Sequence, residues 1–212
     1  MPKTNYLRDE YEESLNALSH AVAVGLFLAG SAALLIKSSE VGSAAFSSCI
    51  VYCISQTLTY ICSSVYHSRV NPVTKKNWRM IDHLSIYLAI SGSWTPIFML
   101  GLDFYPGILL TCAVWSMCGW GMIYKIRNLG KNEIVSVILY LAMGWSGIIS
   151  FLITDNPVLI EAFDLIFIGG VLYTVGTFFY YRDFNKYFHT IWHLFTIAAA
   201  VIHYCAIWSM LS

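Results

Sequence analysis

The chain has 212 residues, of which 58% are hydrophobic and only 11% are charged. A soluble domain carries about 25% charged residues, and a single core could not hide this much apolar surface from water. The composition therefore excludes an ordinary soluble domain and predicts an integral membrane protein that crosses the bilayer several times. The formal net charge is zero, so nothing indicates an electrostatic surface for nucleic acid.

Apolar runs of about 17–25 residues, long enough to cross a bilayer, take up almost the whole sequence. In chain order we predict seven spans, at residues 15–36, 44–66, 80–100, 107–124, 134–153, 158–181 and 187–211. The connections between them are short and polar, and Gly or Pro marks several of them. The predicted fold class is therefore all-α: a single seven-transmembrane helix bundle over residues 1–212, with a short cytoplasmic tail at residues 1–14.

The basic residues predict how this bundle is oriented. All but one of the 12 Lys and Arg residues lie in the N-terminal tail or in the connections after the second, fourth and sixth spans, and the exception is Lys37. Loops on the cytoplasmic side of membrane proteins carry an excess of Lys and Arg. We therefore predict that the N-terminus lies in the cytoplasm and the C-terminus outside.

Two pairs of polar side chains stand out because each pair is separated by four positions. They are Ser63 with His67, and His189 with His193, and this spacing places both members on one face of a helix, about a turn apart. The predicted topology puts both pairs, together with Asp82, at the cytoplasmic ends of their spans. Ionisable groups at membrane depth are costly, which favours a functional interpretation of this set.

Three imidazoles gathered in this way are typical of a zinc site. Catalytic zinc is commonly held by three protein ligands and a water molecule, and His67, His189 and His193 would supply the three nitrogens. Asp82 and Ser63 are then the candidate catalytic residues, because they could hold or deprotonate that water. Two other interpretations stay open: a closed zinc site without chemistry, and histidines that meet water at the level of the lipid headgroups.

Polar residues of the first span are predicted to lie at the same depth. Ser19 and His20 occur early in this span, and Glu12 and Asn16 precede them on the same helical stripe. Glu12 and Asn16 could either support the metal site or cap the first helix, and the sequence does not decide between these roles.

Two further histidines are predicted to lie outside the metal site. His83 points about 100° away from Asp82 on an ideal helix, so we expect it at the membrane interface. His203 follows His193 by ten residues, or about 15 Å along a helix, which is too far for the same ion. We expect His203 to form a buried hydrogen bond across the bundle.

The chain resembles the hemolysin III family, within the progestin and adipoQ receptor group and the wider CREST superfamily of membrane hydrolases. The motifs that carry the resemblance are Glu12-x3-Asn16-x2-Ser19-His20, Ser63-x3-His67 followed by Asp82-His83, and His189-x3-His193 with His203. The resemblance implies a seven-helix bundle with its N-terminus inside, zinc on the three histidines, and Asp82 and Ser63 as water-holding groups. The short tail and loops resemble the bacterial branch, so we expect the bacterial plasma (inner) membrane and do not carry over the ligands of animal receptors.

Several functions are compatible with these features. The leading hypothesis is a zinc-dependent hydrolase that acts on a lipid amide or ester, with membrane lipid as partner or source of substrate. A second is a sensor or regulator of lipid state or membrane energetics with a structural zinc ion. A third, a cytolysin or pore-former, follows from the family name but is disfavoured, because a secreted toxin must first be soluble. A transporter is also disfavoured, because the polar cluster lies at one leaflet only. The sequence leaves the substrate and the oligomeric state open.

Overall fold

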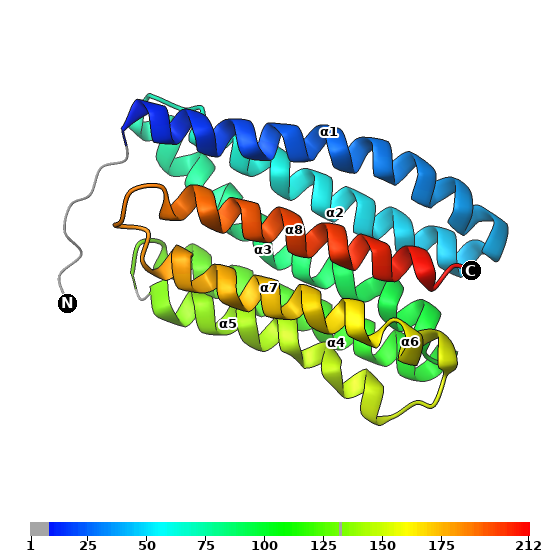
Figure 1. Cartoon of the computed structure of the whole chain (residues 1–212). Coiled ribbons are helices and arrows are strands. Elements are labelled where there is room, and N and C mark those ends of the chain that lie inside the picture. Colours follow the sequence, from blue (N-terminus) through cyan, green and yellow to red (C-terminus); the bar gives the residue numbers. More distant parts are fainter. Residues whose placement is uncertain (1–8, 132) are drawn as a thin grey trace.

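The structure, a computed structural model, describes residues 9–131 and 133–212, and within these ranges it consists of helices without any strand. Seven helices, with α5 and η1 taken together as one, are long and apolar enough to cross a membrane, which confirms the predicted all-α fold with seven spans (Figure 1). The elements are α1 (Glu10–Val41), α2 (Ser43–His67), α3 (Pro72–Gly101), α4 (Phe104–Asn128), α5 (Glu133–Ser146), η1 (Gly147–Leu152), α6 (Pro157–Glu161), α7 (Phe163–Tyr181) and α8 (Phe188–Ser209).

The outer surface of the bundle is apolar, whereas polar side chains turn inward. Leu26, Ile36 and Leu194 are each more than half exposed, and they belong to helices that would face lipid. In contrast, Gln56 and His193 are only 2% and 1% exposed. This arrangement is expected where the surroundings are hydrocarbon, because the interior is then the place where polar groups can find partners.

The basic connections gather at one end of the bundle. The α2–α3, α4–α5 and α7–α8 connections lie at the end where α1 begins (Figure 1). Lys3 and Arg8, which contribute to the predicted orientation, lie outside the described residues. Lys37 lies at the other end, where its Nζ donates hydrogen bonds to the carbonyl of Trp208 and the hydroxyl of Ser212. We refer to the end with the basic connections as the inner end.

Helices α1 and α3 begin earlier than the hydropathy predicts, at Glu10 instead of residue 15 and at Pro72 instead of residue 80. The Asp9 carboxylate caps α1 by accepting a hydrogen bond from the N–H of Glu12 at 2.8 Å, and Asn71 caps α3. The Glu12 N–H and the Lys186 ammonium hold the pKa of Asp9 below its ordinary value. The extra turns are polar and form because they are capped, so hydropathy does not detect them.

The fifth and sixth predicted spans are less regular than predicted. Helix α5 tightens into the 3-10 segment η1 at Gly147, where a Cβ atom would lie 2.3 Å from the Trp94 ring. The predicted sixth span is divided into α6 and α7 at the fully buried Ala162. No Pro or Gly marks this interruption, so the prediction of one continuous helix over residues 158–181 is wrong there.

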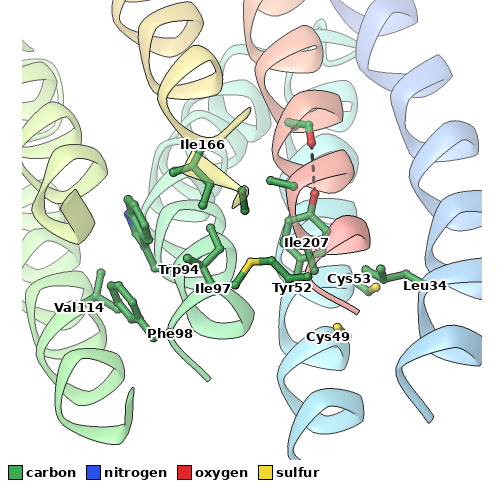
Figure 2. Close-up of a cluster of buried hydrophobic side chains, with 14 of the residues drawn as sticks. Leu34, Cys49, Tyr52, Cys53, Trp94, Ile97, Phe98, Val114, Ile166 and Ile207 are labelled. Carbon is green, nitrogen blue, oxygen red and sulfur yellow. Dashed lines mark hydrogen bonds between the residues drawn. The ribbon is translucent and has the colours of Figure 1, made fainter. Parts of the chain in front are cut away.

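Figure 2 shows a part of the apolar core whose labelled residues lie in the half of the bundle away from the inner end. The Tyr52 hydroxyl crosses this core and donates a hydrogen bond to the carbonyl of Ala200 at 3.2 Å. Close packing of these side chains fixes the helices relative to one another. The core residues labelled in the figure are Leu34, Cys49, Tyr52, Cys53, Trp94, Ile97, Phe98, Val114, Ile166 and Ile207.

A buried ion pair joins α4 to α5 at the inner end. Lys125 is fully buried, and its Nζ donates hydrogen bonds to Glu133 Oε2 at 2.7 Å and to Ser136 Oγ at 3.2 Å. The other Glu133 oxygen accepts hydrogen bonds from the Arg79 guanidinium at 3.4 Å and from the Gly130 N–H at 3.2 Å. Glu133 therefore connects α3, α4 and α5.

Replacing Glu133 by Ala is expected to lower the free energy of unfolding by roughly 3 kcal/mol, because the buried Lys125 ammonium loses its carboxylate partner. Reversible unfolding in mixed detergent micelles measures this change. Glu40→Ala is the matched control, since Glu40 is exposed at the opposite end of the bundle. Equal effects of the two substitutions would contradict the assigned role of Glu133.

Candidate metal centre

Three buried imidazoles meet at the inner end of the bundle. His67 is the last residue of α2, and His189 and His193 lie in the first two turns of α8. The ring centroids are 5.0 Å apart for His67 and His189, 5.0 Å for His67 and His193, and 4.8 Å for His189 and His193. One nitrogen of each ring lies within 4.8 Å of the other two. The structure thus brings together the three histidines that the sequence singles out.

Side-chain and main-chain groups of α1 hold two of these rings through their Nδ1 atoms. His67 Nδ1 lies 2.8 Å from Glu13 Oε2. His193 Nδ1 lies 3.0 Å from the Ser19 hydroxyl and 3.2 Å from the Asn16 carbonyl oxygen. Metal-binding histidines usually direct their second nitrogen to a carboxylate, a carbonyl or a similar partner, which fixes the tautomer and the ring orientation. The Nε2 atoms of both rings are therefore the candidate ligand atoms.

The turn that begins α8 positions the third ring. His189 Nδ1 lies 3.9 Å from Asp183 Oδ2, a residue of the α7–α8 connection. Tyr187, immediately before α8, has a φ of 64°, which bulky side chains rarely adopt. Its N–H donates a hydrogen bond to Glu12 Oε1 at 3.0 Å. Glu12 therefore supports the site from α1, and the capping alternative is wrong for this residue, because Asp9 caps the helix.

His20 packs behind the cluster and does not belong to it. Its ring stacks on His193 with a centroid distance of 3.7 Å and an angle of 8° between the planes. Tyr60 contacts the same ring edge-on at 5.0 Å, and the Thr196 hydroxyl lies 3.5 Å from His20 Nε2. This packing limits rotation of the His193 ring about its side-chain bonds.

Asp82 and Ser63 share an internal cavity with two of the clustered histidines. The cavity has about 120 Å³ available to the centres of water molecules, and its walls are mostly apolar. Ser63, Asp82, His189 and His193 all line it, and Ser63 and Asp82 are 2% and 8% exposed. His67 completes the cluster from α2. Four of the five sequence-predicted residues therefore line one cavity, and the fifth, His67, contacts it through the rings of His189 and His193.

His83 differs from the sequence prediction. It is only 5% exposed and lines the cavity, so its side chain faces the interior of the bundle and is not exposed on the outer surface. The reason is that α3 is covered on this side: the Tyr140 hydroxyl donates a hydrogen bond to the His83 carbonyl at 3.1 Å, and the Tyr180 ring lies 6.4 Å from the His83 ring. An ideal-helix projection does not show which other helices cover a given face.

His203 lies at the far end of the cavity and forms the predicted cross-bundle hydrogen bond. Its Nε2 is 3.1 Å from the Ile166 carbonyl oxygen, so this nitrogen carries the proton and donates it. Gly169 provides the space for the ring, since a Cβ at this position would lie 2.2 Å from His203 Cδ2. His203 therefore joins α8 to α7 and is separate from the three-histidine cluster.

The donor set fits a zinc ion. Three imidazole nitrogens, here all buried and close together, are the protein ligands of many catalytic zinc sites. Zinc–nitrogen bonds of about 2.0–2.1 Å bring tetrahedral ligands closer together than 4.8 Å, so small ring rotations would complete the coordination. Harder cations such as Mg²⁺ and Ca²⁺ prefer oxygen ligands and fit this set less well.

Glu13 is a site residue that the sequence analysis does not identify. It shares a stripe of α1 with Asn16 and His20, at positions i, i+3 and i+7, and this spacing is the signal that could have identified it. Replacing Glu13 by Gln is expected to weaken zinc binding about 10–100-fold, because His67 loses a charged partner. Competition with a chromophoric chelator measures the affinity. Unchanged affinity would show that Glu13 does not support His67 as a ligand.

Comparisons with known proteins agree with this architecture. The family model described as "Haemolysin-III related" matches residues 9–204. A "Hemolysin-3 homolog" of Bacillus subtilis (strain 168) is 33% identical over 198 residues, covering 92% of this chain and 93% of that protein. "Hemolysin-3" of Bacillus cereus is 31% identical over 202 residues, covering 94% and 92%. A human protein, "Monocyte to macrophage differentiation factor", is 28% identical over 208 residues, covering 95% and 85%. The chain therefore belongs to the haemolysin-III related family of multi-pass membrane proteins.

Proposed function

We propose that this protein is a zinc-dependent hydrolase that cleaves an amide or ester bond of a membrane lipid at the cytoplasmic leaflet of the bacterial plasma membrane. The observation that carries the proposal is the shared cavity, in which two of three clustered imidazoles lie with a buried carboxylate and a hydroxyl. When bound, zinc supplies a Lewis acid that polarises a carbonyl and lowers the pKa of water to about 7.

Asp82 is the proposed general base and Ser63 the proposed positioning group. The attacking water gives a proton to the Asp82 carboxylate as its oxygen bonds to the carbonyl carbon of the lipid. The carbon–nitrogen or carbon–oxygen bond then breaks, and Asp82 returns the proton to the leaving amine or alcohol. The Ser63 hydroxyl holds the water by a hydrogen bond. The products are a carboxylic acid and an amine or alcohol.

The surroundings of the site favour a lipid substrate. The cavity continues from Asp82 and His193 along the bundle to His203, between mostly apolar walls. These residues lie on helices that are long and apolar enough to cross a membrane. The basic connections at the same end would place the histidines beneath the cytoplasmic headgroups. A substrate with an apolar chain and a carbonyl near the headgroup matches this arrangement.

The test is hydrolysis by purified protein in lipid nanodiscs that contain a mixture of acylated amides and esters. Zinc-restored protein is expected to release free fatty acid, detected by mass spectrometry, whereas chelator-treated protein and a His67→Ala/His189→Ala/His193→Ala variant are expected to release none. Zinc binding without release above the level of the triple variant would overturn the hydrolase proposal, and would favour a structural zinc ion in a sensor.

A further inference from the structure

An open groove lies outside the bundle, behind the His67 ring. It runs at the inner end between the first turns of α1 and the end of α2, and Glu13, His67, Arg69 and Lys75 are among its lining residues. Glu10 lines it from the α1 side, whereas Arg69 and Lys75 come from the α2–α3 connection and the first turn of α3. The groove therefore reaches the candidate metal centre at His67, the one clustered histidine that does not line the internal cavity.

One carboxylate oxygen in this groove is shared by two partners. Glu13 Oε2 lies 2.8 Å from His67 Nδ1 and 3.1 Å from Lys75 Nζ. The Lys75 side chain is 29% exposed, so its ammonium can also be reached from the groove. Because an ammonium draws electron density from the carboxylate, Lys75 weakens Glu13 as a hydrogen-bond acceptor for His67. A ligand that draws Lys75 away from Glu13 therefore strengthens the hydrogen bond between the Glu13 carboxylate and His67 Nδ1.

The segment that carries Arg69 and Lys75 has the composition of a surface that contacts lipid headgroups. Val70, before α3, is 90% exposed, and Val73, in the first turn of α3, is 71% exposed, so both lie close in sequence to Arg69 and Lys75. Exposed apolar side chains among basic ones are typical of surfaces that insert between anionic headgroups. The basic connections predict that this end faces the cytoplasmic leaflet, which carries the anionic phospholipids.

We propose that this groove binds the phosphate of an anionic phospholipid between Arg69 and Lys75, and that phospholipid binding raises the affinity of the metal centre for zinc. The phosphate draws Lys75 away from Glu13, and Lys75 then no longer competes with His67 for this carboxylate oxygen. The inference rests on the zinc site of the proposed function. Losing such a carboxylate altogether changes metal affinity about 10–100-fold, so relieving its competition is expected to change affinity by roughly threefold to tenfold.

The experiment measures zinc affinity by chelator competition in two kinds of nanodisc, one of phosphatidylcholine alone and one that also contains phosphatidylglycerol. The wild-type protein is expected to bind zinc roughly threefold to tenfold more tightly in the anionic discs. Lys75→Met is expected to bind equally in both, at the higher affinity. Lys76→Met is the matched control, because Lys76 is the neighbouring exposed lysine but does not line the groove, and it should keep the lipid response. Arg69→Gln, a change at an exposed residue, should reduce the response.

Three results would overturn the inference: equal zinc affinity of the wild-type protein in both discs, a lipid response that persists in Lys75→Met, or inorganic phosphate reproducing the effect in phosphatidylcholine discs. The last result would assign the groove to a soluble anion. In each of these cases zinc still binds and the hydrolase proposal stands. Absence of zinc binding in every disc would instead remove the metal centre, and with it both proposals.

Discussion

Replacing His193 by Ala is expected to reduce the zinc content of the purified protein from about one ion per chain to almost none. His193 is 1% exposed, and its Nδ1 meets both the Ser19 hydroxyl and the main-chain carbonyl of Asn16, so contacts with α1 hold the ring in place. Two histidines alone bind zinc far more weakly than three. Elemental mass spectrometry of protein prepared in metal-controlled buffer measures the occupancy.

His203→Ala is the matched control for this prediction. His203 is the same residue type on the same helix, but it is engaged with the Ile166 carbonyl at the far end of the cavity. This variant should keep its zinc, although it loses a cross-bundle hydrogen bond and some stability. Full zinc occupancy in His193→Ala, or an equal loss in both variants, would contradict the three-histidine centre.

Asp82→Asn is expected to lower the rate of lipid hydrolysis by about 10²–10⁴-fold while leaving zinc bound, because the amide cannot take a proton from water. Asn has nearly the same size and shape as Asp, so the cavity and the helix are retained. The rate of fatty acid release, measured together with zinc content on the same preparation, separates loss of chemistry from loss of metal.

Asp164→Asn provides the comparison, since Asp164 is exposed in the first turn of α7, near the opposite end of the bundle. It should hydrolyse lipid at the wild-type rate. Undiminished turnover in Asp82→Asn would show that another group takes the proton. Loss of zinc in the same variant would show that Asp82 acts on the metal ligands and not on the substrate.

The sequence predicts the spans well because membrane burial depends on long apolar runs. It predicts the helix starts poorly, since Asp9 and Asn71 begin their helices through local hydrogen bonds in polar segments. The 3-10 segment after Ser146 begins at Gly147, which packs against the ring of Trp94, a residue far away in the sequence. Such contacts depend on how the helices are placed, and hydropathy carries no information about that placement.

The distinction between local sequence signals and contacts that depend on helix placement also applies to the candidate metal centre. The four-residue spacing of His189 and His193 is a local property, so a helix is enough to predict that they share a face. The partners of Glu12 and Glu13, by contrast, depend on the height at which α1 docks against α2 and α8. Two adjacent acidic residues at the start of a membrane helix are common. Only the packed bundle shows that Glu12 accepts a hydrogen bond from the turn before α8, whereas Glu13 contacts the His67 ring.

The hydrogen bond from the Tyr187 N–H to Glu12 joins the first helix to the turn before the last one, and this has a consequence for the order of assembly during synthesis. Membrane proteins are synthesised from the N-terminus onward, so α1 and α2 enter the bilayer while α8 is still being translated. At that stage the chain offers a single imidazole of the future cluster, too few to retain an ion. If the proposed zinc site forms, zinc binding therefore waits until α8 has packed against α1, and zinc content reports completed synthesis.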